Sequence, residues 1–84
     1  MSSGRIKFFI SFRGKSGSFQ ILENSRLSTV LQIFAKSVGF DQIGALIFEF
    51  GGVELFGDET PKELAFIGEE VVFARLRRPD ENVV

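Results

Sequence analysis

Apolar and polar residues alternate along the first stretch of the chain, from Arg5 to Phe12. A period of two is typical of a β-strand, because successive side chains of a strand point to opposite faces of its sheet. The pattern predicts that Lys7, Phe9 and Ser11 share one face of this strand. The opposite, inward face would carry Ile6, Phe8, Ile10 and Phe12.

Between Ser25 and Gly39 the apolar residues recur instead at spacings of three and four. This spacing places one wide apolar stripe along an α-helix. A helix this short needs to pack that stripe against a sheet to be stable. Asn24 or Ser25 would accept hydrogen bonds from the first-turn amides and so begin the helix. Gly39 would take the left-handed conformation that ends it. The stripe consists of Leu27, Val30, Leu31, Phe34, Ala35 and Val38.

The remaining segments predict the sheet that this helix covers. Residues 13–17 have the composition of a hairpin loop, and Gly51-Gly52 indicates a tight turn. A short helical turn opens at Thr60, and Glu63 follows at the spacing of a capping box. The further predicted strands are 18–22, 46–50, 53–56 and 70–76.

The order of these elements predicts an α+β fold of the β-grasp type. It would be a mixed four- to five-stranded sheet with one main helix packed on one face. The first and last strands would lie parallel in the centre of the sheet, with the helix in the crossover between them. We expect one domain at 5–77, a flexible N-terminus at 1–4 and a flexible C-terminal tail at 78–84.

Composition narrows the possible chemistry. The chain has 84 residues and a net charge of −1, and it contains neither cysteine nor histidine. It therefore lacks thiolate nucleophiles, and it also lacks the commonest general base and metal ligand. We expect no enzyme activity, cofactor, metal or small-molecule substrate. The charge balance and the apolar runs give no reason to expect binding to nucleic acid or to a membrane. The expected location is cytoplasmic and/or nuclear.

Four segments, taken in order, resemble the ubiquitin-like superfamily and most closely its SUMO branch. They are Phe19-Gln20-Ile21 before the helix, Gly39 at its end, 48–52 around the following turn, and Thr60-Pro61-Lys62-Glu63-Leu64 before the last strand. The resemblance covers about residues 5–77. It implies a non-catalytic module that docks on enzymes of the SUMO or ubiquitin pathway, or on a short apolar peptide motif.

The C-terminal sequence departs from the conjugated members of this superfamily, which end in Gly-Gly. Here the last strand runs into Arg77-Arg78-Pro79, and no glycine follows Gly68. We therefore expect the non-conjugated type, although a chain cut from a longer protein would also lack these glycines. Two alternatives stay open. One is a modifier attached to targets; the other is a β-grasp adaptor of the Ras-binding type, which would use basic residues that 18–22 lacks.

The first candidate surface is the groove between the second strand and the helix, where SUMO proteins accept a partner's apolar strand. The resemblance implies walls of Phe19, Ile21 and Val30, with Gln20 and Leu22 beside them. The family usually carries lysines around this groove, and this chain does not. The alternative is that the three apolar residues belong to the core.

The second candidate surface is the outer face of the sheet. Aligning the last strand through 60–64 places Val72, Ala74 and Leu76 inward. The residues left outward are Val71, Phe73 and Arg75. A one-residue shift of register would reverse this assignment. The corresponding face of ubiquitin carries its main apolar docking patch, and Glu49 takes the central position here. The outer-face candidates are Lys7, Phe9, Glu49, Phe73 and Arg75.

An acidic pair, Glu69 and Glu70, precedes the last strand. In SUMO-like domains an acidic loop at this position contacts the SUMO-conjugating enzyme on the side away from its active site. The resemblance therefore adds both residues to the outer-face candidates. The alternative is an ordinary solvated turn.

Overall fold

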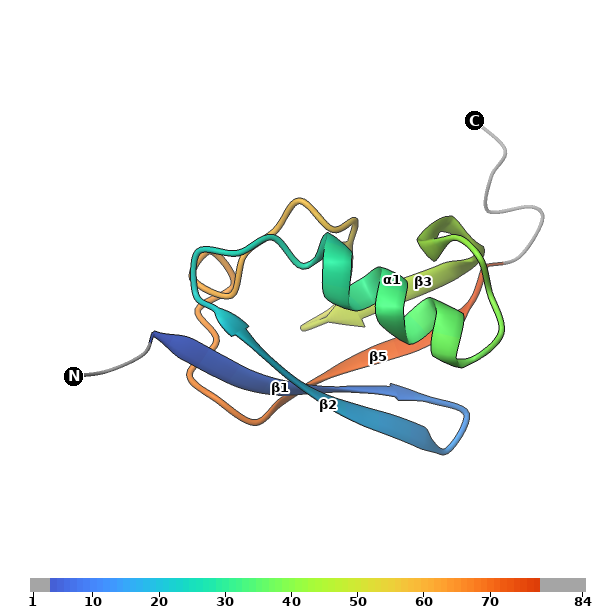
Figure 1. Cartoon of the computed structure of the whole chain (residues 1–84), viewed down its shortest axis with the longest axis horizontal. Helices are drawn as coiled ribbons and strands as arrows, with labels where there is room; N and C mark the ends of the chain where they lie inside the picture. Colours follow the sequence, from blue (N-terminus) through green and yellow to red (C-terminus); the bar gives the residue numbers. More distant parts are fainter. Residues whose placement is uncertain (1–3, 78–84) are drawn as a thin grey trace.

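The computed structural model describes residues 4–77 and shows five strands and one α-helix (Figure 1). The elements are β1 (Arg5–Phe12), β2 (Lys15–Leu22), α1 (Ser28–Ser37), the 3-10 turn η1 (Ile43–Ala45), β3 (Leu46–Phe50), β4 (Val53–Leu55) and β5 (Glu70–Leu76). The predicted flexible ends fall on 1–3 and 78–84, outside the described residues. Gly4 is described, and its carbonyl oxygen accepts a hydrogen bond of 2.9 Å from the amide of Glu23.

The strands form one mixed sheet in the order β2-β1-β5-β3-β4. β1 and β5 are parallel neighbours near the centre, with Phe8 beside Glu70 and Ser11 beside Phe73, and the other pairs are antiparallel. α1 lies across one face of the sheet (Figure 1). This topology confirms the predicted α+β arrangement. It forms because the apolar stripe of the helix and the apolar face of the sheet are both removed from water when they cover each other.

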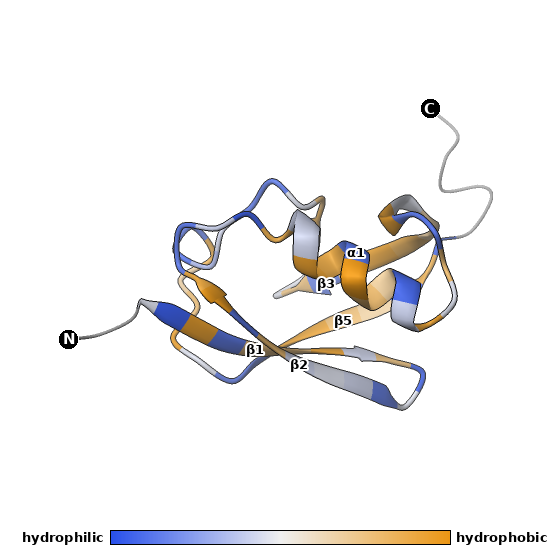
Figure 2. Cartoon of the chain, in the orientation of Figure 1, coloured by the Kyte–Doolittle hydropathy of each residue, from blue (hydrophilic) through white to orange (hydrophobic). Residues whose placement is uncertain are grey.

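The core lies between this helix and the sheet. Phe8, Leu27, Leu31 and Val72 are completely buried, and hydrophobic residues concentrate along β3, β5 and the inner side of α1 (Figure 2). The Phe34 ring of the helix packs against Phe48 of β3, with ring centroids 6.4 Å apart. Burying each such side chain contributes roughly 1.5–3 kcal/mol, so the facing stripes hold the two layers together.

The start of the helix differs from the prediction. α1 begins at Ser28, and neither Asn24 nor Ser25 caps it, so that prediction was wrong. The amides of Leu27 and Ser28 donate instead to the backbone carbonyls of Glu59 and Gly57, at 2.9 and 3.0 Å. These first-turn amides find their acceptors in a loop thirty residues away, which no local sequence pattern reveals.

The end of the helix follows the prediction. Gly39 has a φ of 100°, a backbone conformation that favours glycine. The amide of Phe40 reaches back to the carbonyl of Ala35 at 2.8 Å, the long bond of a Schellman motif. The chain can therefore leave α1 sharply and enter η1.

The first hairpin is tighter than predicted. Residues 13–17 do not form a loop, because β2 already begins at Lys15. The turn consists of Arg13 and Gly14, with φ angles of 49° and 81°. Two successive positive φ angles make a type I′ turn, whose twist matches that of the flanking strands. The hairpin thus gains three residues of strand that composition alone assigned to a loop.

The short turn before β5 forms the predicted capping box. The amide of Thr60 donates to Glu63 Oε1 at 3.1 Å, and the amide of Glu63 donates to Thr60 Oγ1 at 3.1 Å. The turn delivers Phe66 into the core, where its ring lies 5.5 Å from Phe8 and 4.7 Å from Phe50.

Candidate functional site

The outer face of the sheet exposes an apolar surface over its two central strands. On β5, Val72 is completely buried while Phe73 is 61% exposed, which confirms the predicted register and excludes the shifted one. Phe9 of β1 lies beside Val71 of β5, and Phe73 is the next outward residue along β5. We call Phe9, Val71 and Phe73 the outer-sheet patch.

A basic residue borders this patch on β1. Lys7 Nζ lies 5.4 Å from the centroid of the Phe9 ring, a cation–π distance. Lys7 as a whole remains exposed. Lys7 and Phe9 are therefore brought together as predicted.

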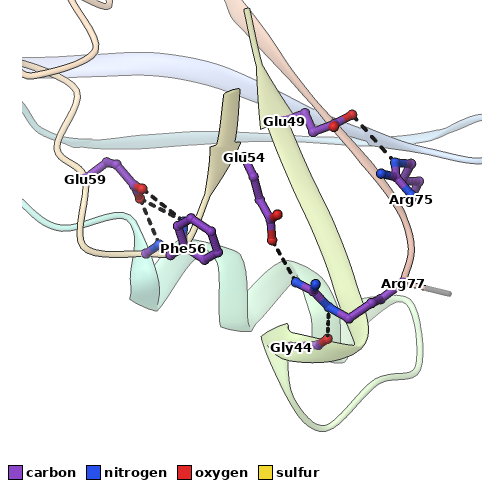
Figure 3. A network of polar contacts seen from close by, with 8 residues as sticks. Gly44, Glu49, Glu54, Phe56, Glu59, Arg75 and Arg77 are labelled. Carbon is purple, nitrogen blue, oxygen red and sulfur yellow. Dashed lines mark hydrogen bonds and ion pairs between the residues drawn. The ribbon is translucent and has the colours of Figure 1, made fainter. Parts of the chain in front are cut away.

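On the other side of the patch the outer face is ionic. Arg75 Nε lies 3.7 Å from Glu49 Oε1, and Glu49 is the residue of β3 directly opposite Phe73 (Figure 3). Both side chains remain about half exposed, so the pair contributes little to stability. The predicted position of Glu49, beside the aromatic residues on the same face, is confirmed.

A second, tighter ion pair spans β3, and the sequence did not reveal it. Arg77 Nη2 donates to Glu54 Oε2 at 2.7 Å, and Arg77 Nε donates to the carbonyl of Gly44 at 2.8 Å (Figure 3). Since β3 lies between β5 and β4, this bridge crosses β3. Ile47, whose neighbour on β5 is Arg75, shares the outer face but is only 3% exposed.

The two acidic residues before β5 have different surroundings. Glu70 accepts hydrogen bonds from the amides of Ile67 and Gly68, at 2.7 and 2.8 Å, so its carboxylate stabilises the turn. Glu69 is exposed, and its amide donates to the carbonyl of Lys7 at 2.7 Å. Of the pair, Glu69 is thus the exposed residue, whereas the Glu70 carboxylate is held within the turn.

The proposed groove residues divide between the two faces of β2. Phe19 and Ile21 are partly buried against the core, and Val30 of α1 is 4% exposed. The Phe19 ring packs 6.0 Å from Phe8 and 6.4 Å from Phe34, as the core interpretation expects. Gln20 and Leu22 alternate with them and are exposed on the outer side of β2.

The described part of the chain offers little space for a small molecule. A hollow of about 50 Å³ lies beside β4, between Ile43, Phe56 and the Arg77–Glu54 pair. Ligand sites usually have volumes of about 300–1,000 Å³. Among residues 4–77 we find no group of three acidic side chains placed to hold a metal ion. Within the same residues no helix has the length and apolar character needed to cross a membrane.

The fold is shared with a chain in the crystal structure of a pParkin–pUb–UbcH7 complex, with a TM-score of 0.76 and 22% sequence identity. The match covers 90% of this chain and 24% of that chain, so this chain spans about a quarter of its length. The likeness establishes a ubiquitin-like β-grasp fold. No protein-family model matches the sequence, and neither does any curated protein.

Proposed function

We propose that this domain is a non-catalytic protein-interaction module, SUMO-like in type, that docks on an enzyme of the ubiquitin or SUMO pathway through its outer-sheet patch. The observation that carries the proposal is the 61% exposure of Phe73 on the same face as Phe9 and Val71, which are neighbours on β1 and β5. The structural neighbour, which is crystallised with pUb and UbcH7, supports partners of this kind. On this proposal the chain works in the cytoplasm or nucleus and performs no chemistry itself.

The chemistry of the patch defines the partner's surface. Covering Phe73, which is 61% exposed, would supply part of the roughly 1.5–3 kcal/mol that full burial of such a side chain contributes, and Val71, which is 37% exposed, would add a smaller share. Because Lys7 is positively charged, we expect the partner to carry an acidic residue next to the apolar surface that contacts the patch. The Glu49–Arg75 pair occupies the position where ubiquitin is apolar. Receptors that bind ubiquitin through its apolar patch should therefore bind this domain weakly.

An NMR titration of the ¹⁵N-labelled chain tests the proposal with three partners, added separately. They are the SUMO-conjugating enzyme, an acidic SUMO-interaction peptide and free ubiquitin. We expect the conjugating enzyme to shift the amide resonances of Phe9, Glu69 and Phe73. Shifts confined to Phe19, Ile21 and Val30 would instead assign binding to the groove beside β2. No shifts with any partner would contradict the proposal.

A pair of matched substitutions sharpens this test. Phe73→Ser should weaken binding about tenfold or more, because it removes the largest exposed apolar side chain of the patch. Phe56→Ser is the control, since Phe56 is 64% exposed but follows β4, beyond β3 from the patch. Equal losses in the two variants, measured by calorimetry, would show that the patch is not the specific docking surface.

A further inference from the structure

The two edges of the sheet are protected to different degrees. β4 forms one edge and has three residues, so it offers little backbone for further pairing. β2 forms the other edge with eight residues, and its pairing with β1 is unbroken from Lys15 to Leu22. It has neither a proline nor a bulge, the usual means of blocking an edge strand. β2 is therefore the edge open to another strand.

The hairpin geometry shows which backbone groups of β2 face outward. A two-residue I′ turn is closed by a pair that exchanges both of its hydrogen bonds, here Phe12 and Lys15. Alternate residues of β2 then direct their amides and carbonyls away from β1. The amide of Glu23 donates to the carbonyl of Gly4, the residue directly before β1. Odd-numbered residues from Lys15 to Glu23 therefore direct their backbone groups toward β1, as this alternation requires. The outward-directed residues are Ser16, Ser18, Gln20 and Leu22, all exposed. The carbonyl of Leu22 accepts the amide of Ser25 at 2.9 Å, so Ser16, Ser18 and Gln20 form the open part of this edge.

We propose that the occupant of this edge is the β2 strand of a second copy, paired antiparallel about a two-fold axis at Phe19. In this register Lys15 lies opposite Glu23 of the other copy, the residue that directly follows β2, so the dimer gains two pairs of opposite charge. Neither side chain forms an ion pair with another residue of 4–77, so both are free to do so. The outward groups of Ser18 and Gln20 exchange hydrogen bonds across the axis.

The side chains on the helix side of β2 also complement themselves in this register. Gly17 lies opposite Ile21 of the other copy, a small residue facing a large one. Phe19 lies opposite its own copy, where two partly exposed rings can cover each other. Pairing β2 with β4 would instead join copies head to tail, but only three residues of β4 are available, and such a contact does not close.

The proposed dimer adds to the module function without depending on it. A two-fold axis perpendicular to the sheet keeps both helices on one face of a ten-stranded sheet. Both outer-sheet patches then lie together on the opposite face. Two linked patches would bind a partner with paired sites more tightly than either patch alone.

Charge reversal tests the register. Lys15→Glu and Glu23→Lys should each weaken self-association about tenfold, because each turns two attractive pairs into repulsive ones. A mixture of these two variants should associate again, and so should the chain that carries both substitutions. Analytical ultracentrifugation of the full chain, up to about 1 mM for an interface this small, measures the association. Weakening by the single substitutions without recovery in the mixture would overturn the register.

A backbone substitution tests the edge itself. Ser18→Pro removes an amide that points away from β1, so the monomer should keep its fold, as edge strands tolerate proline there. The dimer should be lost, whereas Ser18→Ala should keep it. In the unmodified chain, hydrogen exchange at Ser18 and Gln20 should slow as concentration rises.

Three results would overturn the proposal. One is a chain that stays monomeric at 1 mM, with exchange at Ser18 independent of concentration. Another is a dimer that Phe73→Ser abolishes and the Lys15 and Glu23 substitutions leave intact, which would assign association to the outer face. The third is protection of the β2 edge only when a SUMO-interaction peptide is added. If Ser18→Pro fails to fold, the charge variants still decide.

Discussion

At the scale of single residues, Gly57 shows how one position can join two distant segments. Its φ is 105°, and a Cβ atom there would lie 3.0 Å from the Cβ and 3.1 Å from the Cα of Ser28. Its carbonyl also accepts the amide of Ser28 at 3.0 Å. The loop backbone therefore lies against the start of α1, and only a residue without a side chain fits between them.

The first prediction at this scale compares two glycines. Gly57→Ala should lower the free energy of unfolding by about 2–4 kcal/mol, because it combines an unfavourable φ with a clash against backbone. Gly14→Ala should cost about 1–2 kcal/mol, since its φ of 81° is unfavourable but nothing lies within 4 Å. Urea denaturation measures both. Equal costs would mean that the contact with Ser28 is unimportant.

At the scale of elements, the two loops that follow β4 and precede β5 are built alike. In each, an exposed apolar residue is followed by glycine, and a glutamate three positions after the apolar residue accepts both of their amides. Glu59 holds the amides of Phe56 and Gly57, at 3.0 and 2.8 Å, as Glu70 does for Ile67 and Gly68. The first of these turns is the one that supplies backbone acceptors to α1, so it substitutes for a side-chain cap.

The prediction at this scale concerns helix capping. Asn24→Ala and Ser25→Ala should each change stability by less than about 0.5 kcal/mol, because neither side chain caps α1. Thr60→Ala should cost about 1 kcal/mol, since Thr60 Oγ1 accepts the amide of Glu63. Thermal and urea unfolding of the three variants give the comparison. A loss of about 1 kcal/mol in the free energy of unfolding for Asn24→Ala or Ser25→Ala would show that this side chain caps the helix after all.

At the scale of the whole molecule, the outer face divides into an apolar half over β1 and β5 and an ionic half over β3 and β4. The two ion pairs of the ionic half differ in burial. The Arg77 and Glu54 side chains are 20% and 28% exposed, against 45% and 39% for Arg75 and Glu49. The Arg77–Glu54 pair also joins the residue that directly follows β5 to β4 across β3, so it links two strands that are not neighbours in the sheet.

Double-mutant cycles test this difference. Arg77→Ala and Glu54→Ala should show a coupling of about 1 kcal/mol, because the pair is short, partly shielded and supported by Gly44. Arg75→Ala and Glu49→Ala should couple by less than about 0.5 kcal/mol, as exposed pairs do. Unfolding free energies at low and high salt provide the measurement. A stronger coupling at the exposed pair would contradict this assignment.

Much of the architecture was predictable because its causes are local. The residue order directly shows the alternation along Arg5–Phe12 and 70–76 and the apolar stripe of the helix. In each element, the spacing of the apolar residues identifies the side that is buried. The outward positions of Phe9 and Phe73 followed from the same alternation. The loop at 13–17 was misassigned because the positive φ of Arg13, a residue not suited to it, has no clear compositional signal.

The order of apolar and polar residues alone determined the strands and the helix apart from the starts of α1 and β2, the inner and outer faces of β1 and β5, and the single-helix β-grasp arrangement. Only the tertiary structure decided where α1 begins, that Ile47 is buried on the outer face, and which edge of the sheet stays open. The physical reason is range. Periodicity acts between residues a few positions apart, whereas the amide acceptors of α1 and the Arg77–Glu54 bridge join residues more than twenty positions apart, which meet only once the sheet has formed.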